Sequence, residues 1–205
     1  PYSSLLLASC GLERDYVIHK KGISVSRRHS GLTIELMEKC GAVIEITEEK
    51  TSISPWTSNP PSEWNVPSDG SMMSFPILAC LLTKQPIRIE NPVDANDALG
   101  HEILFEHLSS FGIDYQDLTL RCNGSFDEVD IDLRDANDLL PPLAAILALS
   151  GGGRLRGASH AKHKESNRIL STKKLLEAFG LTATIEDDGL SIEGGQMLTT
   201  PDSFV

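Results

Sequence analysis

The chain reads LEAFGLTATI over residues 176–185, which is an apolar helix end, a glycine and then alternating side chains. Two earlier stretches follow the same pattern, LMEKCGAVIEI at residues 36–46 and LSSFGIDY at residues 108–115. Glycine just after a helix adopts the left-handed conformation that ends the helix at low cost, and alternation with a period of two is typical of a half-buried strand. The glycines are 71 and 68 residues apart. We therefore predict three copies of one repeat unit.

Each repeat also contains an earlier and more apolar helix. The second copy carries SMMSFPILACLL at residues 71–82, and the third carries LLPPLAAILAL at residues 139–149. A helix that is apolar on nearly every side is buried on nearly every side. We therefore predict that the helices over 71–83 and 139–149 lie side by side in a core. The unit is predicted to be β-α-β-α-β-β, an α/β fold with buried helices and outer sheets.

A proline-rich stretch separates the first repeat from the second. Residues 54–67 read SPWTSNPPSEWNVP, and four prolines among small polar residues exclude a helix or a central strand. We place a domain boundary there. Residues 1–66 then hold one repeat unit, and residues 67–205 hold two.

The composition narrows the class of protein. The chain has 205 residues and a net charge of -11. This negative charge argues against a protein that binds nucleic acids or membrane surfaces. No apolar run approaches the ~20 residues of a membrane-spanning helix. The four cysteines form no C-x-x-C pair, so we expect small buried side chains in a reducing compartment, the cytoplasm.

One cluster of cations departs from this acidic balance. Between Arg154 and Lys174 the sequence has seven Lys or Arg but only one acid, Glu165. The cluster surrounds the start of a predicted helix that runs to Phe179, and a helix start already carries a partial positive charge. A bound anion such as phosphate explains the cluster, and a solvated basic helix face is the alternative. No metal is implied, because His101 and His107 lie six residues apart and lack an acid or thiol partner at metal-ligand spacing. No organic cofactor is implied either, since SGGG at residues 150–153 is too short for a phosphate-binding glycine loop.

Several motifs, in this order, resemble those of the 5-enolpyruvylshikimate-3-phosphate (EPSP) synthase family. KESNR at residues 164–168 resembles the signature K-E-[ST]-D-R, and NDLLP at residues 137–141 resembles an aspartate-led buried helix. VSRRH at residues 25–29 resembles the V-S-K-P-Y segment, and VPSDGS at residues 66–71 resembles the G-D-x-S-S stretch at the domain crossover. The resemblance spans essentially the whole chain.

The resemblance implies an inside-out α/β barrel fold with two domains of three repeat units each. Residues 1–66 would be the last unit of the first, shikimate-phosphate-binding domain, and residues 67–205 the first two units of the second. The family's S-S-Q triplet, D-H-R motif and last lysine have no counterpart here, so we expect an internal fragment that is inactive alone. The sequence also departs from the family at Asn167, Ser68, Met72 and Met73.

The implied reaction transfers the enolpyruvyl group of phosphoenolpyruvate to the 5-hydroxyl of shikimate 3-phosphate and releases phosphate. By resemblance, Asp138 handles the proton of the hydroxyl and Glu165 that of the methylene carbon. Lys164 would stabilise charge near the departing phosphate, and Arg168 would bind the carboxylate of phosphoenolpyruvate. The further expected substrate contacts are Ser26, Arg27 and His160.

Three other interpretations stay open. Asp138 could cap its helix, as aspartate commonly does. The enzyme could be the related transferase that acts on UDP-N-acetylglucosamine, although that relative lacks K-E-S-x-R, or the chain could be a non-catalytic repeat or binding domain of the same fold. The expected partners are the two small-molecule substrates, without nucleic acid or membrane, and the parent protein is expected to be a monomer.

Overall fold

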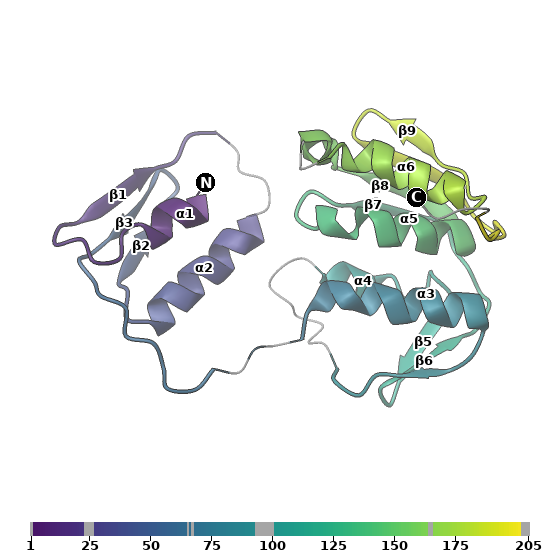
Figure 1. Ribbon diagram of the computed structural model, residues 1–205, viewed down its shortest axis with the longest axis horizontal. Coiled ribbons are helices and arrows are strands. Elements are labelled where there is room, and N and C mark those ends of the chain that lie inside the picture. The colour runs from purple at the N-terminus through teal and green to yellow at the C-terminus, as the bar shows by residue number, and fades with distance from the viewer. Residues whose placement is uncertain are drawn as a thin grey trace. The chain divides into compact units, whose positions relative to one another are not determined.

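The computed structural model describes most of the chain, namely residues 2–22, 27–64, 66, 68–92, 101–163 and 166–201, except for the side chains of residues 27, 28 and 163. The chain divides into two compact units, Pro1–Pro67 and Ser68–Val205 (Figure 1). Each unit has a hydrophobic core of its own.

The first unit is a small sheet with two helices. Its elements are α1 (Tyr2–Leu7), β1 (Tyr16–His19), α2 (Arg27–Lys39), β2 (Ile44–Ile46) and β3 (Lys50–Ile53). The strands form an antiparallel sheet in the order β1-β3-β2, and the two helices pack on each other. Trp56 is buried in this core, where its indole N–H donates to Ser9 Oγ at 2.9 Å. The proline-rich stretch is therefore anchored to the first unit near its start.

The second unit contains the remaining two repeats. The earlier repeat consists of the 3₁₀ turn η1 (Gly70–Met73), α3 (Ser74–Thr83), β4 (Ile87–Arg88), α4 (Glu102–Glu106), β5 (Ile113–Gln116) and β6 (Thr119–Cys122). The later repeat consists of β7 (Val129–Asp132), the 3₁₀ turn η2 (Asn137–Leu139), α5 (Leu140–Leu149), β8 (Gly152–Arg156), the 3₁₀ turn η3 (Ser159–His163), α6 (Arg168–Ala178), β9 (Thr184–Glu186) and β10 (Gly189–Glu193). The sheets have the orders β4-β6-β5 and β7-β8-β10-β9, and only β7 and β8 pair in parallel among the described strands.

The predicted repeat is confirmed. In each copy the last strand lies between the two strands before it, which gives β1-β3-β2, β4-β6-β5 and β8-β10-β9. Gly41, Gly112 and Gly180 end their helical segments with φ of 97°, 73° and 75°. The later repeat of the second unit shows all six β-α-β-α-β-β elements, and the described residues of the other two show the last five. The described strands form three open sheets and close no barrel.

The two apolar helices lie side by side, as predicted, but they are not equally buried. Helix α5 packs against α3, α6, β8 and β10, and six of its ten residues are buried. Helix α3 packs against α5 and the sheet β4-β6-β5, yet Phe75 is 57% exposed and Leu82 is 50% exposed. The prediction of all-round burial is therefore wrong for α3, because no described element covers its outer face.

The four cysteines test the expectation of small buried side chains. All four cysteines are free thiols: Cys80 is buried, Cys40 and Cys122 are half-buried, and Cys10 is exposed. Burial raises the pKa of the Cys80 thiol. The expectation of burial is wrong for Cys10, which lies in the turn after α1.

Within the part of the chain that the structure describes, no helix is both long and apolar enough to cross a membrane.

Candidate functional site

The site predicted in the second unit is carried by two loops that leave neighbouring strands. Strand β7 leads to Asp138 in η2, and β8 leads through η3, which holds His160, to Arg168 at the start of α6. Asp132 and Arg156, the last residues of the two strands, are register partners in the parallel pair. Parallel strands end at the same edge of a sheet, so both loops begin side by side.

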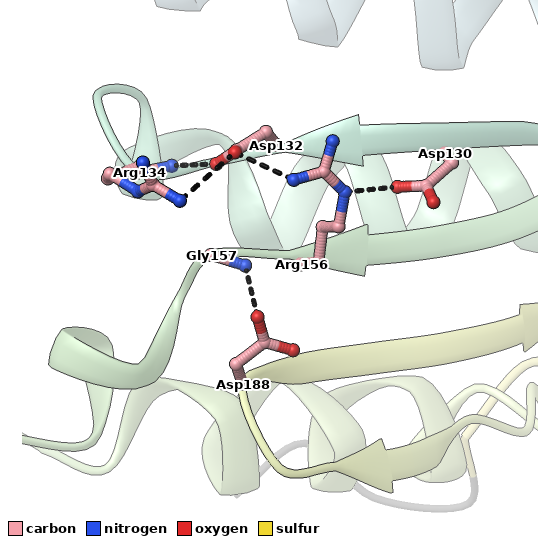
Figure 2. A network of polar contacts seen from close by, with 6 residues as sticks. All are labelled: Asp130, Asp132, Arg134, Arg156, Gly157 and Asp188. Carbon is pink, nitrogen blue, oxygen red and sulfur yellow. Dashed lines mark hydrogen bonds and ion pairs between the residues drawn. The ribbon is translucent and has the colours of Figure 1, made fainter.

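A polar network joins the two loops where they leave the sheet (Figure 2). Arg156 Nε donates to Asp130 Oδ1 at 2.7 Å, and Arg156 Nη1 donates to Asp132 Oδ2 at 2.8 Å. The hydrogen bond and charge of Asp130, with Asp132, raise the pKa of Arg156. The backbone N–H of Gly157 donates to Asp188 Oδ2 at 2.9 Å. Gly157 has a φ of 73°, a backbone conformation that favours glycine, and a Cβ there would lie 2.2 Å from Asp132 Oδ1, so a larger residue would be strained and would displace the Asp132 side chain.

Asp138 and Arg168 meet across the two loops. Arg168 Nη1 donates to Asp138 Oδ1 at 2.5 Å and to Asn137 Oδ1 at 2.9 Å. The side chain of Asp138 is 49% exposed, and that of Arg168 is 23% exposed. Neither η2 nor α5 is capped by a side chain, so the interpretation of Asp138 as a helix cap is wrong. A carboxylate and a guanidinium, two predicted site residues, are thus in direct contact.

Asn167 has a structural role at the start of α6. Its side-chain oxygen accepts the backbone N–H of Leu170 at 3.1 Å and caps the helix. Asparagine and aspartate are about equally good caps. The departure from the aspartate of K-E-[ST]-D-R therefore keeps the cap from which Arg168 follows directly.

Removing this cap is expected to weaken the second unit. We expect Asn167→Ala to lower its free energy of unfolding by about 0.5–2 kcal/mol, because the N–H of Leu170 loses its partner. Asn167→Asp keeps the acceptor and should match the wild type. Urea denaturation monitored by circular dichroism measures the difference in the free energy of unfolding between the variants. Equal stability of the alanine and aspartate variants would contradict a capping role.

Several cations of the cluster already have partners within the protein. Arg156 is paired with two aspartates, Lys173 forms an ion pair with Glu177, and Lys162 Nζ donates to the carbonyl of Asp187 at 2.7 Å. The cluster is therefore not one uniform anion site. His160 is half-buried in η3, with its Nε2 atom inside the protein.

The remaining predicted site residues lie outside the described residues. Ser26, Lys164 and Glu165 are not described, nor is the side chain of Arg27, so their roles stay predictions. Among the described residues no three His, Cys, Asp or Glu are grouped to bind a metal ion. Asn137 was not among the predicted site residues, since an asparagine just before a helix is ordinarily a cap or turn residue.

Comparison with known proteins identifies relatives of this chain. The chain matches the family model described as EPSP synthase (3-phosphoshikimate 1-carboxyvinyltransferase) over residues 2–202. The 3-phosphoshikimate 1-carboxyvinyltransferases of Methanocella arvoryzae and Korarchaeum cryptofilum are each 29% identical to it. The alignments cover 95% of this chain but 47% and 46% of those proteins. The chain thus spans about half the length of the curated relatives it matches.

Solved structures show the same fold. The EPSP synthase of Acinetobacter baumannii aligns with a TM-score of 0.67 and 20% identity, over 94% of this chain and 45% of that chain. The enolpyruvyl transferase NikO of Streptomyces tendae aligns with a TM-score of 0.65 and 22% identity, over 93% of this chain and 45% of that chain. Since the family model matches nearly every residue, this chain belongs to the EPSP synthase (3-phosphoshikimate 1-carboxyvinyltransferase) family.

Proposed function

We propose that this chain is part of an enzyme that transfers the enolpyruvyl group of phosphoenolpyruvate to the 5-hydroxyl of shikimate 3-phosphate and releases phosphate. The contact between Asp138 and Arg168 is the observation that carries this proposal, because it brings a carboxylate, which can accept a proton, next to a guanidinium, which can bind an anion. Family membership supports it independently. In this proposal residues 1–66 belong to a shikimate-phosphate-binding domain, and residues 67–205 belong to the second domain.

The proposed reaction has two halves. In the addition, the hydroxyl oxygen bonds to C2 of phosphoenolpyruvate and loses its proton, while the methylene carbon gains one. In the elimination, the resulting methyl carbon loses a proton, the double bond reforms and the bond from C2 to the phosphate oxygen breaks. Both halves need one group that accepts a proton and another that donates one.

Asp138 and Glu165 are assigned the two proton transfers. Asp138 holds the 5-hydroxyl and accepts its proton, and its half-exposed carboxylate is accessible to a substrate. Glu165 delivers the proton to the methylene carbon and removes it again in the elimination. Lys164 stabilises the charge that develops near the departing phosphate, a role that suits a compact ammonium group.

Arg168 is assigned to the carboxylate of phosphoenolpyruvate. A planar guanidinium can donate two parallel hydrogen bonds to a carboxylate, which fixes both the position and the orientation of the ligand. Its side chain keeps 23% of its surface exposed beside Asp138, where a ligand can reach it. Ser26 and Arg27 are assigned to the phosphate of shikimate 3-phosphate, and His160 to a further polar contact.

An assay of phosphate release tests the proposal. We compare this chain with an extended protein, in which the chain continues at both ends to the length of its curated relatives. The extended protein should release phosphate from the two substrates together. The 205-residue chain alone should show no measurable turnover, because holding both reactants in register contributes about 7–11 kcal/mol to catalysis.

The outcomes separate the alternatives. An extended protein that folds but stays inactive would refute the proposed function. Phosphate release with UDP-N-acetylglucosamine as the acceptor, in place of shikimate 3-phosphate, would assign the chain to the related transferase instead. Turnover by the short chain would show that its own residues already form a complete site.

A further inference from the structure

Asn137 is a buried polar residue that contacts the predicted anion-binding arginine. Its side chain is carried by η2, directly before Asp138, and the residue is only 2% exposed. Its Oδ1 accepts a hydrogen bond from Arg168 Nη1 at 2.9 Å, and its main-chain carbonyl oxygen lies 3.4 Å from the same nitrogen. Two acceptors on one residue therefore face one nitrogen of the guanidinium.

The burial of Asn137 stabilises its hydrogen bond with Arg168. A buried amide that lacks a hydrogen-bond partner costs about 1–3 kcal/mol. The turn that carries Asn137 continues directly into the buried helix α5, so its position is fixed by the core. Asp138 contacts the same nitrogen, but its side chain is half exposed and accessible to ligands and water.

The side-chain amide of Asn137 is uncharged, which affects how strongly Arg168 can attract an anion. A carboxylate that orients an arginine cancels part of its charge, as Asp138 does here, whereas the amide oxygen of Asn137 accepts a hydrogen bond without adding a second negative charge beside Arg168. A rigid acceptor restricts the rotation of the guanidinium plane and so reduces the entropy lost when a carboxylate binds.

We infer that Asn137 is a positioning residue, which holds the guanidinium of Arg168 in the orientation that receives the substrate carboxylate. This inference rests on the proposed function, in which Arg168 binds phosphoenolpyruvate. Asn137 acts through Arg168 and not on the substrate itself. Its effect should therefore disappear when the planar guanidinium is replaced.

The first test measures Arg168 in the 205-residue chain without any ligand. Nuclear magnetic resonance of 15N-labelled arginine side chains reports how fast the guanidinium rotates, and Arg168→Lys assigns the signal. We expect slow rotation in the wild type and faster rotation in Asn137→Ala. Asn137→Asp keeps Oδ1 and should keep slow rotation. Unchanged rotation in Asn137→Ala would overturn the inference.

The second test measures the binding of phosphoenolpyruvate to the same chain by chemical-shift titration. We expect Asn137→Ala to raise the Kd about 10-fold, which corresponds to about 1.4 kcal/mol. In an Arg168→Lys background the same substitution should change the Kd little. An equal change in both backgrounds would overturn the inference, since Asn137 would then act independently of Arg168.

Controls separate this inference from the proposed function. Asn59→Ala, at an exposed asparagine of the first unit, should change neither rotation nor binding. Backbone spectra of each variant confirm that the fold is retained. If the wild-type chain fails to bind phosphoenolpyruvate, the proposed function of Arg168 loses its support, while the rotation measurement still decides whether Asn137 positions it.

Discussion

Asp138→Asn in the extended protein is expected to lower the rate of phosphate release by about 10²–10⁴-fold, the usual contribution of a positioned acid–base group. Asparagine keeps an oxygen that can accept the hydrogen bond from Arg168 Nη1, which now goes to Asp138 Oδ1 at 2.5 Å. The geometry should survive while the proposed proton acceptor is lost. The KM for phosphoenolpyruvate should therefore change much less than kcat.

A matched control is available on an exposed strand. Asp114 lies on β5, far along the chain from the predicted site residues, and is exposed. Asp114→Asn should leave turnover near the wild-type value. An Asp138→Asn variant that folds and retains more than a tenth of the wild-type kcat would show that Asp138 transfers no proton.

Leu143→Ala is expected to have the largest effect on stability. Leu143 is fully buried in α5, the helix that packs against α3, α6 and the strands β8 and β10. Truncating a buried leucine removes apolar contacts and leaves a cavity, which costs about 2–5 kcal/mol. The free energy of unfolding of the second unit should fall by that amount, measured from the exchange of α5 backbone amides in urea.

The same substitution at the surface provides the comparison. Leu175 in α6 is 52% exposed, so Leu175→Ala should change the free energy of unfolding by no more than about 0.5 kcal/mol. Unfolding of the first unit is followed separately by the fluorescence of Trp56, which is buried there. The leucine variants should leave that transition unchanged. Similar losses for the two leucine variants would contradict the central position of α5.

The repeats were predictable because their signals are local. A glycine after each second helix and alternation in the following strand identified three copies, and the all-apolar composition of 139–149 identified the buried helix. The exposed face of α3 was not predictable in the same way. The sequence of α3 shows which residues are apolar, but not whether another element covers them.

The site was less predictable because its contacts join distant parts of the chain. The ion pair of Lys173 with Glu177 follows from a spacing of four residues on one helix. The pairing of Arg156 with Asp130 depends instead on the register of β7 against β8, which the alternation within each strand does not reveal. For the same reason, the contact of Asn137 with Arg168, 31 residues away, needed the fold itself.

The parallel pairing of β7 and β8 also sets an order of assembly. The hairpin of β9 and β10 can close through the two residues Asp187 and Asp188, and such hairpins form within about 1–10 μs. Strands β7 and β8 cannot pair until the intervening segment with α5 has folded back across the sheet, which carries a larger loop-closure entropy. Asp138 and Arg168 lie beyond this pair on their respective loops. We therefore expect the contact between Asp138 and Arg168, the proposed acid–base and anion-binding pair, to form only in the late, non-local stage of folding, after the local hairpins exist.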